Sequence, residues 1–252
     1  MHKLILKNDN MRLKINLKTK NNFKVPFNYN HILSSIIYKK IHDLDLAHEL
    51  HTSNSFKFFN FSQLNIQNRK LVEDGIISKN GRISFYLSSP NDLLIKNIVN
   101  GFVDNLEVKF KNKTLFVEKI EALRTPDFKE KSEFKTLSPI NIRDLNENNK
   151  RIDLAPSDKF FRRIENNLIK KYCVFNDIES TDKKIKVYSE MANVKRKRIT
   201  IPKGPNTTYH RAYMMDLVLE GDTDLIEFAY DVGLGEKNSM GFGMIKYIEP
   251  KK

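Results

Sequence analysis

The chain has 252 residues, 40% of them hydrophobic, which is enough to build one large domain or two small ones. No stretch approaches the roughly 20 apolar residues of a membrane span, and the first residues lack the apolar segment of a secretory signal. The single cysteine, Cys173, excludes an intrachain disulfide and a cysteine-based metal cluster, so we expect a reducing cytoplasm. A net charge of +13 favours an anionic partner such as nucleic acid, although an AT-rich genome would also enrich lysine.

Hydrophobic periodicity in the first half predicts one βαββαβ unit. Leu13, Ile15 and Leu17 alternate with polar residues, which predicts a half-buried strand over residues 11–18. A helix is expected over about 30–50, strands over 55–62 and 82–88, a helix over 90–101 and a strand over 105–122. Ser89 is the expected cap of the second helix and Gly101 its expected stop. This order of elements is that of a ferredoxin-like unit.

The second half repeats this order more loosely. A strand over 134–140 is followed by a polar loop and by a helix that Ser157 or Asp158 caps. Strands over 184–190 and 209–219, a helix over 223–230 and a strand over 242–248 complete the pattern. We therefore expect the α+β class, with two tandem ferredoxin-like (βαββαβ) units over residues 11–123 and 124–252.

The most specific segment is a glycine-rich loop over residues 232–244, VGLGEKNSMGFGM. Its glycines permit positive φ and close approach to another chain, and its N–H groups are suited to phosphate oxygens. It matches neither the dinucleotide fingerprint nor the phosphate loop of nucleotide-binding proteins. A tight turn covering a sheet is the alternative interpretation. The residues expected to contact RNA are Gly233, Gly235, Lys237, Asn238, Ser239, Gly241 and Gly243.

Basic residues cluster in the second half. One run is formed by Lys195, Arg196, Lys197 and Arg198, and it precedes Tyr209, His210 and Arg211. Further cations, among them Lys170 and Lys171, lie on the helix expected after Ser157. Such groups neutralise phosphates, and a neighbouring aromatic ring can stack on a base. We expect the run at 195–198 to bind RNA, while a solvated basic face is the alternative for any single run.

The pattern GxGxxxxxGFG near the C-terminus, with EKNS inside it, resembles the signature loop of the CRISPR-associated RAMP proteins. It is most similar to the branch that cuts precursor guide RNA within its repeats. The segments MRLKINL, KVPFNYNHILSSIIYKKI and LSPI are similar as well, so the resemblance spans residues 11 to 248. It implies a RAMP, RRM-like fold and an endoribonuclease that binds CRISPR repeat RNA, as precursor and as processed guide. A non-catalytic RAMP subunit that binds guide RNA in a CRISPR effector complex is the alternative.

The resemblance also implies a metal-independent reaction with no cofactor, in which the 2′-OH attacks the neighbouring phosphorus. The implied catalytic residues are Tyr38, which orients or deprotonates the 2′-OH, His51, the general acid, and Lys57, which stabilises the transition state. Each has a plain alternative: a core tyrosine, a surface histidine, one lysine among many. His42 and His48 are alternative acids, and His48 with His51 lacks a third ligand for a metal. The choice between monomer and homodimer stays open, as do contacts with effector-complex proteins, the repeat recognised and the position of the cut.

Overall fold

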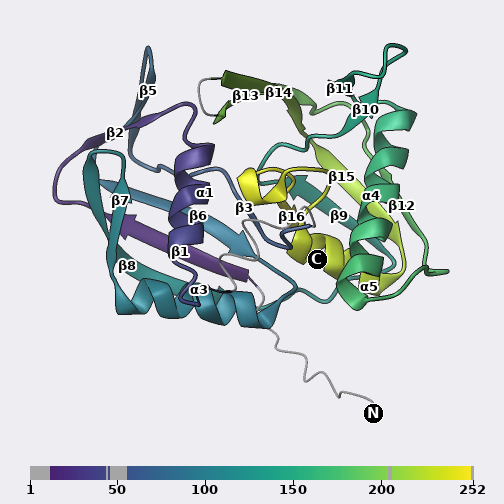
Figure 1. Cartoon of the computed structure of the whole chain (residues 1–252), viewed down its shortest axis with the longest axis horizontal. Coiled ribbons are helices and arrows are strands. Elements are labelled where there is room, and N and C mark those ends of the chain that lie inside the picture. Colours follow the sequence, from purple (N-terminus) through teal and green to yellow (C-terminus); the bar gives the residue numbers. More distant parts are fainter. Residues whose placement is uncertain (1–11, 44, 46–55, 204–205, 251–252) are drawn as a thin grey trace.

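The computed structural model describes residues 12–43, 45, 56–203 and 206–250, and it shows two antiparallel sheets side by side (Figure 1). The first half contains β1 (Arg12–Lys18), β2 (Phe23–Pro26), α1 (Asn30–Lys39), β3 (Asn60–Phe61), β4 (Arg69–Val72), β5 (Gly75–Ser78), β6 (Arg82–Ser88), α3 (Asp92–Asp104), β7 (Glu107–Phe110) and β8 (Lys113–Leu123). Its main sheet has the strand order β3-β6-β1-β8-β7.

The second half contains β9 (Lys131–Thr136), β10 (Arg143–Leu145), β11 (Arg151–Asp153), α4 (Asp158–Asn176), β12 (Ile185–Tyr188), β13 (Lys195–Lys203), β14 (Asn206–Met214), β15 (Asp216–Gly221), α5 (Thr223–Val232), the 3₁₀ helix η1 (Asn238–Met240) and β16 (Ile245–Tyr247). Its main sheet has the order β12-β15-β9-β16. In both halves the first strand of the βαββαβ unit therefore lies between the third and the fourth. The predicted pair of ferredoxin-like units is the observed architecture.

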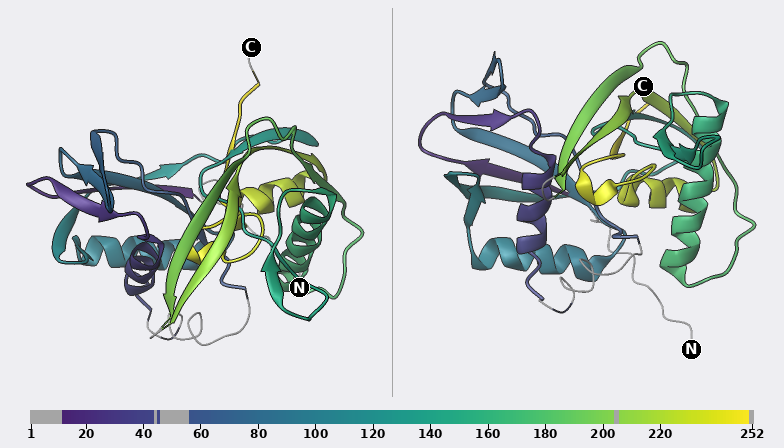
Figure 2. Two further views of the ribbon diagram at one scale, coloured as in Figure 1. Left: turned by 90° about the horizontal axis from the view of Figure 1, so that it is seen from above. Right: turned by 45° about the horizontal axis from the view of Figure 1, so that its top comes forward.

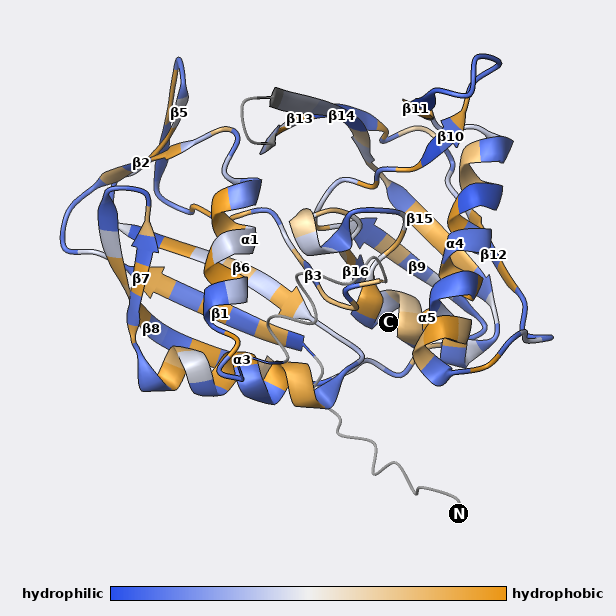
Figure 3. Ribbon diagram, in the orientation of Figure 1, coloured by the Kyte–Doolittle hydropathy of each residue, from blue (hydrophilic) through white to orange (hydrophobic). Residues whose placement is uncertain are grey.

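Strand β1 occupies the centre of the first sheet because its apolar face can be buried completely. It pairs with β6 on one side and with β8 on the other, and Ile15 faces Phe85 and Ile120 across these pairings. Ile15 and Phe85 are fully buried. Figure 3 shows apolar and polar residues mixed along α1 and α3, and the buried core includes Leu33 and Ile37 of α1 and Ile98 of α3. Complete burial of such a side chain contributes about 1.5–3 kcal/mol, so this layer supplies much of the core of the first half.

The second predicted helix differs from the structure at both ends. Asn91, and not Ser89, caps α3, and its side chain accepts a hydrogen bond from the backbone N–H of Leu94 at 3.1 Å. Gly101 does not end the helix, which continues to Asp104. A Cβ atom at Gly101 would lie 2.1 Å from the backbone oxygen of Lys40, just after α1. The glycine therefore allows two segments to pack closely and has no role as a stop signal.

Four other predicted boundaries are wrong. The strand expected over 105–122 is a hairpin, β7 and β8, because the chain turns at Lys111, where φ is +54°. The strand expected over 209–219 is divided between β14 and β15, which belong to different sheets. In the described residues, the strand expected over 55–62 is only β3, and the first helix ends at Lys39, with residues 46–50 of its expected range outside the described part.

Three features that the sequence pattern missed extend from the two main sheets. The first half carries a small sheet, β2-β5-β4, and the second half carries a long hairpin, β13–β14, and the short pair β10–β11. Figure 2 shows the β13–β14 hairpin reaching from the second half across to the first. No helix in the described ranges is both long and apolar enough to cross a membrane.

The two halves meet at a buried polar seam. The guanidinium of Arg12, at the start of β1, lies 3.4 Å from the ring centroid of Tyr230 and donates hydrogen bonds to the backbone oxygens of Tyr230 and Ile245. The side chain of Asn60 donates to the backbone oxygen of Asp231 at 2.7 Å, and the hydroxyl of Ser88 donates to the same oxygen at 2.9 Å. The first sheet is therefore bound to the end of α5, where the glycine-rich loop begins.

Candidate active site

The glycine-rich loop connects α5 to β16 at the centre of the molecule (Figure 1), and it is folded against protein along most of its length. The N–H of Leu234 donates to the oxygen of Gly243 at 2.9 Å, and the N–H of Gly243 donates to the oxygen of Pro139 at 3.0 Å. A Cβ atom at Gly243, where φ is +78°, would lie 1.8 Å from the oxygen of Leu234. The glycine is required by the fold of the loop itself.

Only the tip of the loop, residues 236–240, is partly exposed, whereas all four glycines are buried. At Gly241, φ is +80°, and a Cβ atom would lie 2.4 Å from the ring of Phe61 on β3. This glycine therefore lets the loop pack tightly against the first half of the chain. RNA contact by the loop stays a prediction, and the part of the loop open to a ligand carries Lys237, Asn238 and Ser239.

A buried cation supports the tip from below. Lys171 on α4 is 1% exposed, so its expected place on the surface of the helix is wrong. Its ammonium donates hydrogen bonds to the oxygen of Gly233 at 3.0 Å, to the oxygen of Gly235 at 2.7 Å and to Oδ1 of Asn238 at 2.6 Å. Burial lowers the pKa of Lys171 to about 7, because the charged form loses its hydration. The charge of Glu236 acts in the opposite direction.

A cleft of about 430 Å³ opens beside the tip and is formed by both halves. The first half contributes Phe56, Lys57, Phe58 and Phe59, and the second contributes Arg143, Lys171, Val232, Gly235, Glu236, Lys237, Asn238 and Ser239. Arg143 and Glu236 form an ion pair within this wall, with Nε and Oε2 at 2.7 Å. Partial burial lowers the pKa of Lys57. The cleft therefore brings one predicted catalytic lysine to the predicted RNA-contacting tip.

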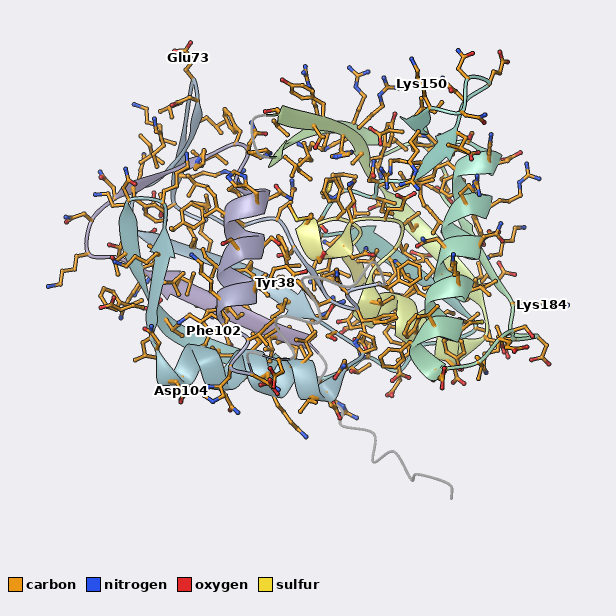
Figure 4. All side chains as sticks on the ribbon, viewed as in Figure 1. Tyr38, Glu73, Phe102, Asp104, Lys150 and Lys184 are labelled. Atoms are coloured by element: carbon orange, nitrogen blue, oxygen red, sulfur yellow. The ribbon has the colours of Figure 1, made fainter. Side chains whose placement is uncertain are left out.

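Tyr38 reaches the same tip from α1. Its hydroxyl is hydrogen-bonded to the side chain of Ser239, and its ring packs edge-on against Phe59 at 5.4 Å between centroids. Figure 4 marks Tyr38 on the part of α1 near the middle of the molecule. Burial raises the pKa of Tyr38, and the hydrogen bond from Ser239 acts in the opposite direction. Two of the three predicted catalytic residues thus lie at one end of the loop.

Of the three histidines considered as the general acid, the structure describes only His42. His51 and His48 lie outside the described residues. His42 is exposed on the surface, with Nδ1 2.8 Å from a carboxylate oxygen of Asp104, and it does not line the cleft. Among the residues that the structure describes, no group of three or more His, Cys, Asp or Glu side chains is arranged to hold a metal ion.

The predicted basic run lies on β13 and forms a second cavity, of about 670 Å³, with the start of the second half. Its walls are Arg151, Ile152, Asp153, Arg196, Lys197, Arg198, Tyr209, His210 and Arg211. Lys195 to Arg198 are all exposed, and the guanidinium of Arg198 lies 4.2 Å from the ring centroid of Tyr209. The pairing of β13 with β14 brings this run beside Tyr209–Arg211.

His210 stands between this cavity and the loop tip. It is buried, and Nδ1 lies 3.8 Å from Oδ1 of Asp153. Burial and, next, the charge of Lys237 lower the pKa of His210. The carboxylate of Asp153 also accepts hydrogen bonds from the side chain of Asn141 and from the N–H of Arg211. Sequence reasoning missed Asp153 and Arg143, because they belong to short strands with no periodic signal. It gave no role to Glu236 of the loop, whose ion pair with Arg143 depends on the fold.

Two ferredoxin-like units, a glycine-rich loop at their junction and a basic hairpin define a protein of the RAMP class. The family model described as "CRISPR-associated protein Cas6, N-terminal" matches residues 24–121, and that described as "CRISPR associated protein Cas6, C-terminal" matches residues 123–247. The chain belongs to the Cas6 family of CRISPR-associated endoribonucleases. The resemblance found in the sequence is thereby confirmed.

Individual relatives agree with this assignment. The chain is 38% identical to CRISPR-associated endoribonuclease Cas6 1 of Methanocaldococcus jannaschii over 96% of this chain and 95% of the relative. A solved structure titled "CRISPR associated protein Cas6" is similar with a TM-score of 0.81 and 37% identity, over 95% of this chain and 99% of that one. Another, titled "An RAMP protein binding different RNA substrates", has a TM-score of 0.83 and 29% identity, over 95% of this chain and 100% of that one.

The packing of Gly241 against Phe61 generates a prediction about stability. We expect Gly241→Ala to lower the free energy of unfolding by about 1–3 kcal/mol, because the new methyl group combines overpacking with an unfavourable positive φ. Urea denaturation would measure the loss. Lys246→Ala, at an exposed position of β16, is the control and should change the stability by no more than about 0.5 kcal/mol. Equal stabilities of the two variants would show that the loop does not depend on this contact.

Proposed function

We propose that this endoribonuclease cuts CRISPR precursor RNA within its repeats, without a metal or a cofactor. The 2′-OH of one nucleotide would attack the adjacent phosphorus, and the 5′-oxygen of the next would leave, giving a 2′,3′-cyclic phosphate and a 5′-OH. The proposal is carried by a convergence at the loop tip: Tyr38 is hydrogen-bonded to Ser239, and Ser239 lines one cleft together with Lys57. A guide-RNA subunit without activity would not need this convergence.

The proposed roles follow from the charge of each group near neutral pH. Because burial raises the pKa of Tyr38, the phenol keeps its proton there and orients the 2′-OH by a hydrogen bond. Lys57 faces the cleft and would stabilise the negative charge that develops on the phosphorane. His51, proposed on the resemblance, would protonate the leaving 5′-oxygen.

The RNA would contact basic residues of both cavities. The run from Lys195 to Arg198 is exposed and would neutralise phosphates on one side. The loop tip, with Lys237, Asn238 and Ser239, would contact the backbone near the scissile phosphate, while the buried glycines shape the loop. We further propose that residues 11–123 and 124–252 are two domains, the first carrying the catalytic side chains and the second the loop.

The basic run generates a prediction about binding. Replacing Lys195, Arg196, Lys197 and Arg198 together by Ala should weaken the binding of repeat RNA. It should also reduce the slope of log K against log salt by roughly 3, because about four phosphate contacts are lost at about 0.7 each. A filter-binding titration over a salt series would measure both. The control removes an equal charge elsewhere, by replacing four exposed lysines of the first half: Lys70, Lys79, Lys109 and Lys113. Equal losses in the two variants would exclude a specific role for the run.

The catalytic residues generate a second prediction. His51→Ala should reduce the single-turnover cleavage rate by about 10² to 10⁴, with RNA affinity nearly unchanged, because only proton transfer to the leaving oxygen is lost. Tyr38→Phe and Lys57→Met should also reduce the rate more than the affinity. His42→Ala and His48→Ala serve as controls. If one of these two abolished cleavage while His51→Ala cut normally, His51 would be the wrong acid.

The nucleophile generates a third prediction. A single 2′-deoxy substitution just upstream of the scissile phosphate should abolish cleavage and leave binding almost intact, because one hydroxyl is a small part of a phosphate-dominated interface. The same substitution one nucleotide away is the control. Cleavage by the wild-type protein should continue in EDTA and leave 2′,3′-cyclic phosphate ends. A nuclease that uses metal ions and water would stop in EDTA and tolerate the deoxy substitution. Such a result would refute the mechanism while leaving the family assignment intact.

A further inference from the structure

The buried ammonium of Lys171 has a complete set of acceptors. The three oxygens that it contacts are the carbonyls of Gly233 and Gly235 and the side-chain oxygen of Asn238, at 3.0, 2.7 and 2.6 Å. An ammonium has three N–H donors, so each acceptor receives one proton. A neutral amine has only two N–H bonds and would direct its lone pair at the third oxygen. The arrangement therefore suits the charged form of the lysine.

Such a cation is costly to bury, since no carboxylate forms an ion pair with it among the described residues. The nearby Glu236 forms an ion pair with Arg143, with Nη2 of the arginine 2.5 Å from Oε2 of the glutamate. The compensation comes from the backbone of the loop, because two carbonyls of positive-φ glycines are directed at one point below the tip. The lysine is thus part of the loop's internal structure and lies on the wall of the catalytic cleft.

The contact with Asn238 extends this support to the tip. While Oδ1 of Asn238 accepts from Lys171, its Nδ2 donates to the oxygens of Leu234 and Phe242 at 3.1 and 3.0 Å. Both strands of the loop are therefore connected through one amide. The next residue, Ser239, is fixed on its other side, because its backbone oxygen accepts from the hydroxyl of Ser34 on α1 at 2.8 Å. Its side chain is hydrogen-bonded to Tyr38.

We propose that Lys171 is a positioning residue for RNA cleavage: through Asn238 it sets the place of Ser239, and Ser239 orients the hydroxyl of Tyr38. Lys171 itself need not touch RNA. The inference rests on the proposed function of Tyr38 and assigns the source of its alignment to a helix of the other half of the chain. It also explains why a lysine, and not an apolar residue, occupies a core position of α4.

Two variants test the proposal from opposite sides. Lys171→Met removes the cation and keeps the length of the side chain, and Asn238→Ala removes the acceptor and leaves the lysine in place. Each should reduce the single-turnover cleavage rate by about 10- to 100-fold, since a displacement of about 1 Å can cost this much. The affinity of Lys171→Met for repeat RNA with a 2′-deoxy scissile nucleotide should change by less than about threefold. In the double variant the losses should not add, because both changes break one connection.

Lys113→Met is the matched control, an exposed lysine in the β7–β8 hairpin, and it should leave rate and affinity unchanged. Thermal unfolding would verify that each variant is folded at the temperature of the assay. If Lys171→Met did not fold, Asn238→Ala alone would decide. A folded variant of either kind that cuts at the wild-type rate would overturn the proposal, as would parallel losses of rate and affinity in Lys171→Met.

A spectroscopic measurement tests the positioning role of Lys171 independently of the proposed function. In protein labelled with ¹³C at the ζ carbon of tyrosine, the signal of Tyr38 would be identified by its loss in Tyr38→Phe. This signal should shift in Lys171→Met and in Asn238→Ala and stay in place in Lys113→Met, whether or not RNA is cut. An unchanged signal would refute the positioning role even in an active enzyme. If both variants show the shift but the wild-type protein cuts no repeat RNA, the proposed function alone is refuted.

Discussion

The structure depends on the contact that holds its two halves together at Arg12. A guanidinium buried in the protein is unfavourable unless its donors are used, and here two backbone oxygens and the ring of Tyr230 provide the interaction. The contact joins the central strand of the first sheet to the end of α5 and to β16, the two elements that border the glycine-rich loop. The cleft beside the loop tip has one wall from each half, so its shape depends on how the two halves are docked.

Next to Arg12, the polar seam also buries the carboxyl of Asp231, and this burial lowers the stability of the protein. Burial raises the pKa of Asp231 to about 7, although the charge of Arg12 acts in the opposite direction. The folded protein therefore binds a proton more tightly at this site than the unfolded chain does. Between about pH 4 and pH 7, this group makes the free energy of unfolding fall as the pH rises. The seam is a place where a polar connection has been kept at some expense of stability.

The parts of the fold that could be predicted are those with a long periodic pattern. The alternation in β1 and the helical spacing in α4 each extend over enough residues to be unambiguous. The pattern failed where one alternation crosses from β14 into β15, because the change of sheet at Met215 leaves no mark in the hydrophobic period. It also failed for Gly101, which resembles a stop signal but serves the packing of α3 against Lys40. Both errors arise from tertiary contacts.

The candidate site, too, could be predicted only in part from the sequence. Tyr38, Lys57 and the loop were found because a family resemblance supplied their roles. In the structure Tyr38 contacts Ser239 of the loop tip, and Ser239 lines the cleft together with Lys57. Lys171 looked like one of many surface cations, since a helical lysine has the same sequence signal whether its ammonium is hydrated or held by carbonyls. Asp153 and Arg143 had no signal, because their function depends on neighbours that the fold brings from distant segments.

The polar seam has a consequence for the order of folding. Arg12 and Ile245 are separated by 233 positions, and Asn60 and Asp231 by 171, whereas strand pairs such as β7–β8 are local. Contacts between distant residues require the closure of a long chain segment, which is entropically costly until other structure has shortened it. Each sheet with its helices should therefore consolidate first, and the docking of the halves should come late. Hydrogen exchange would then report a partly open state in which both sheets are protected and the loop amides are not.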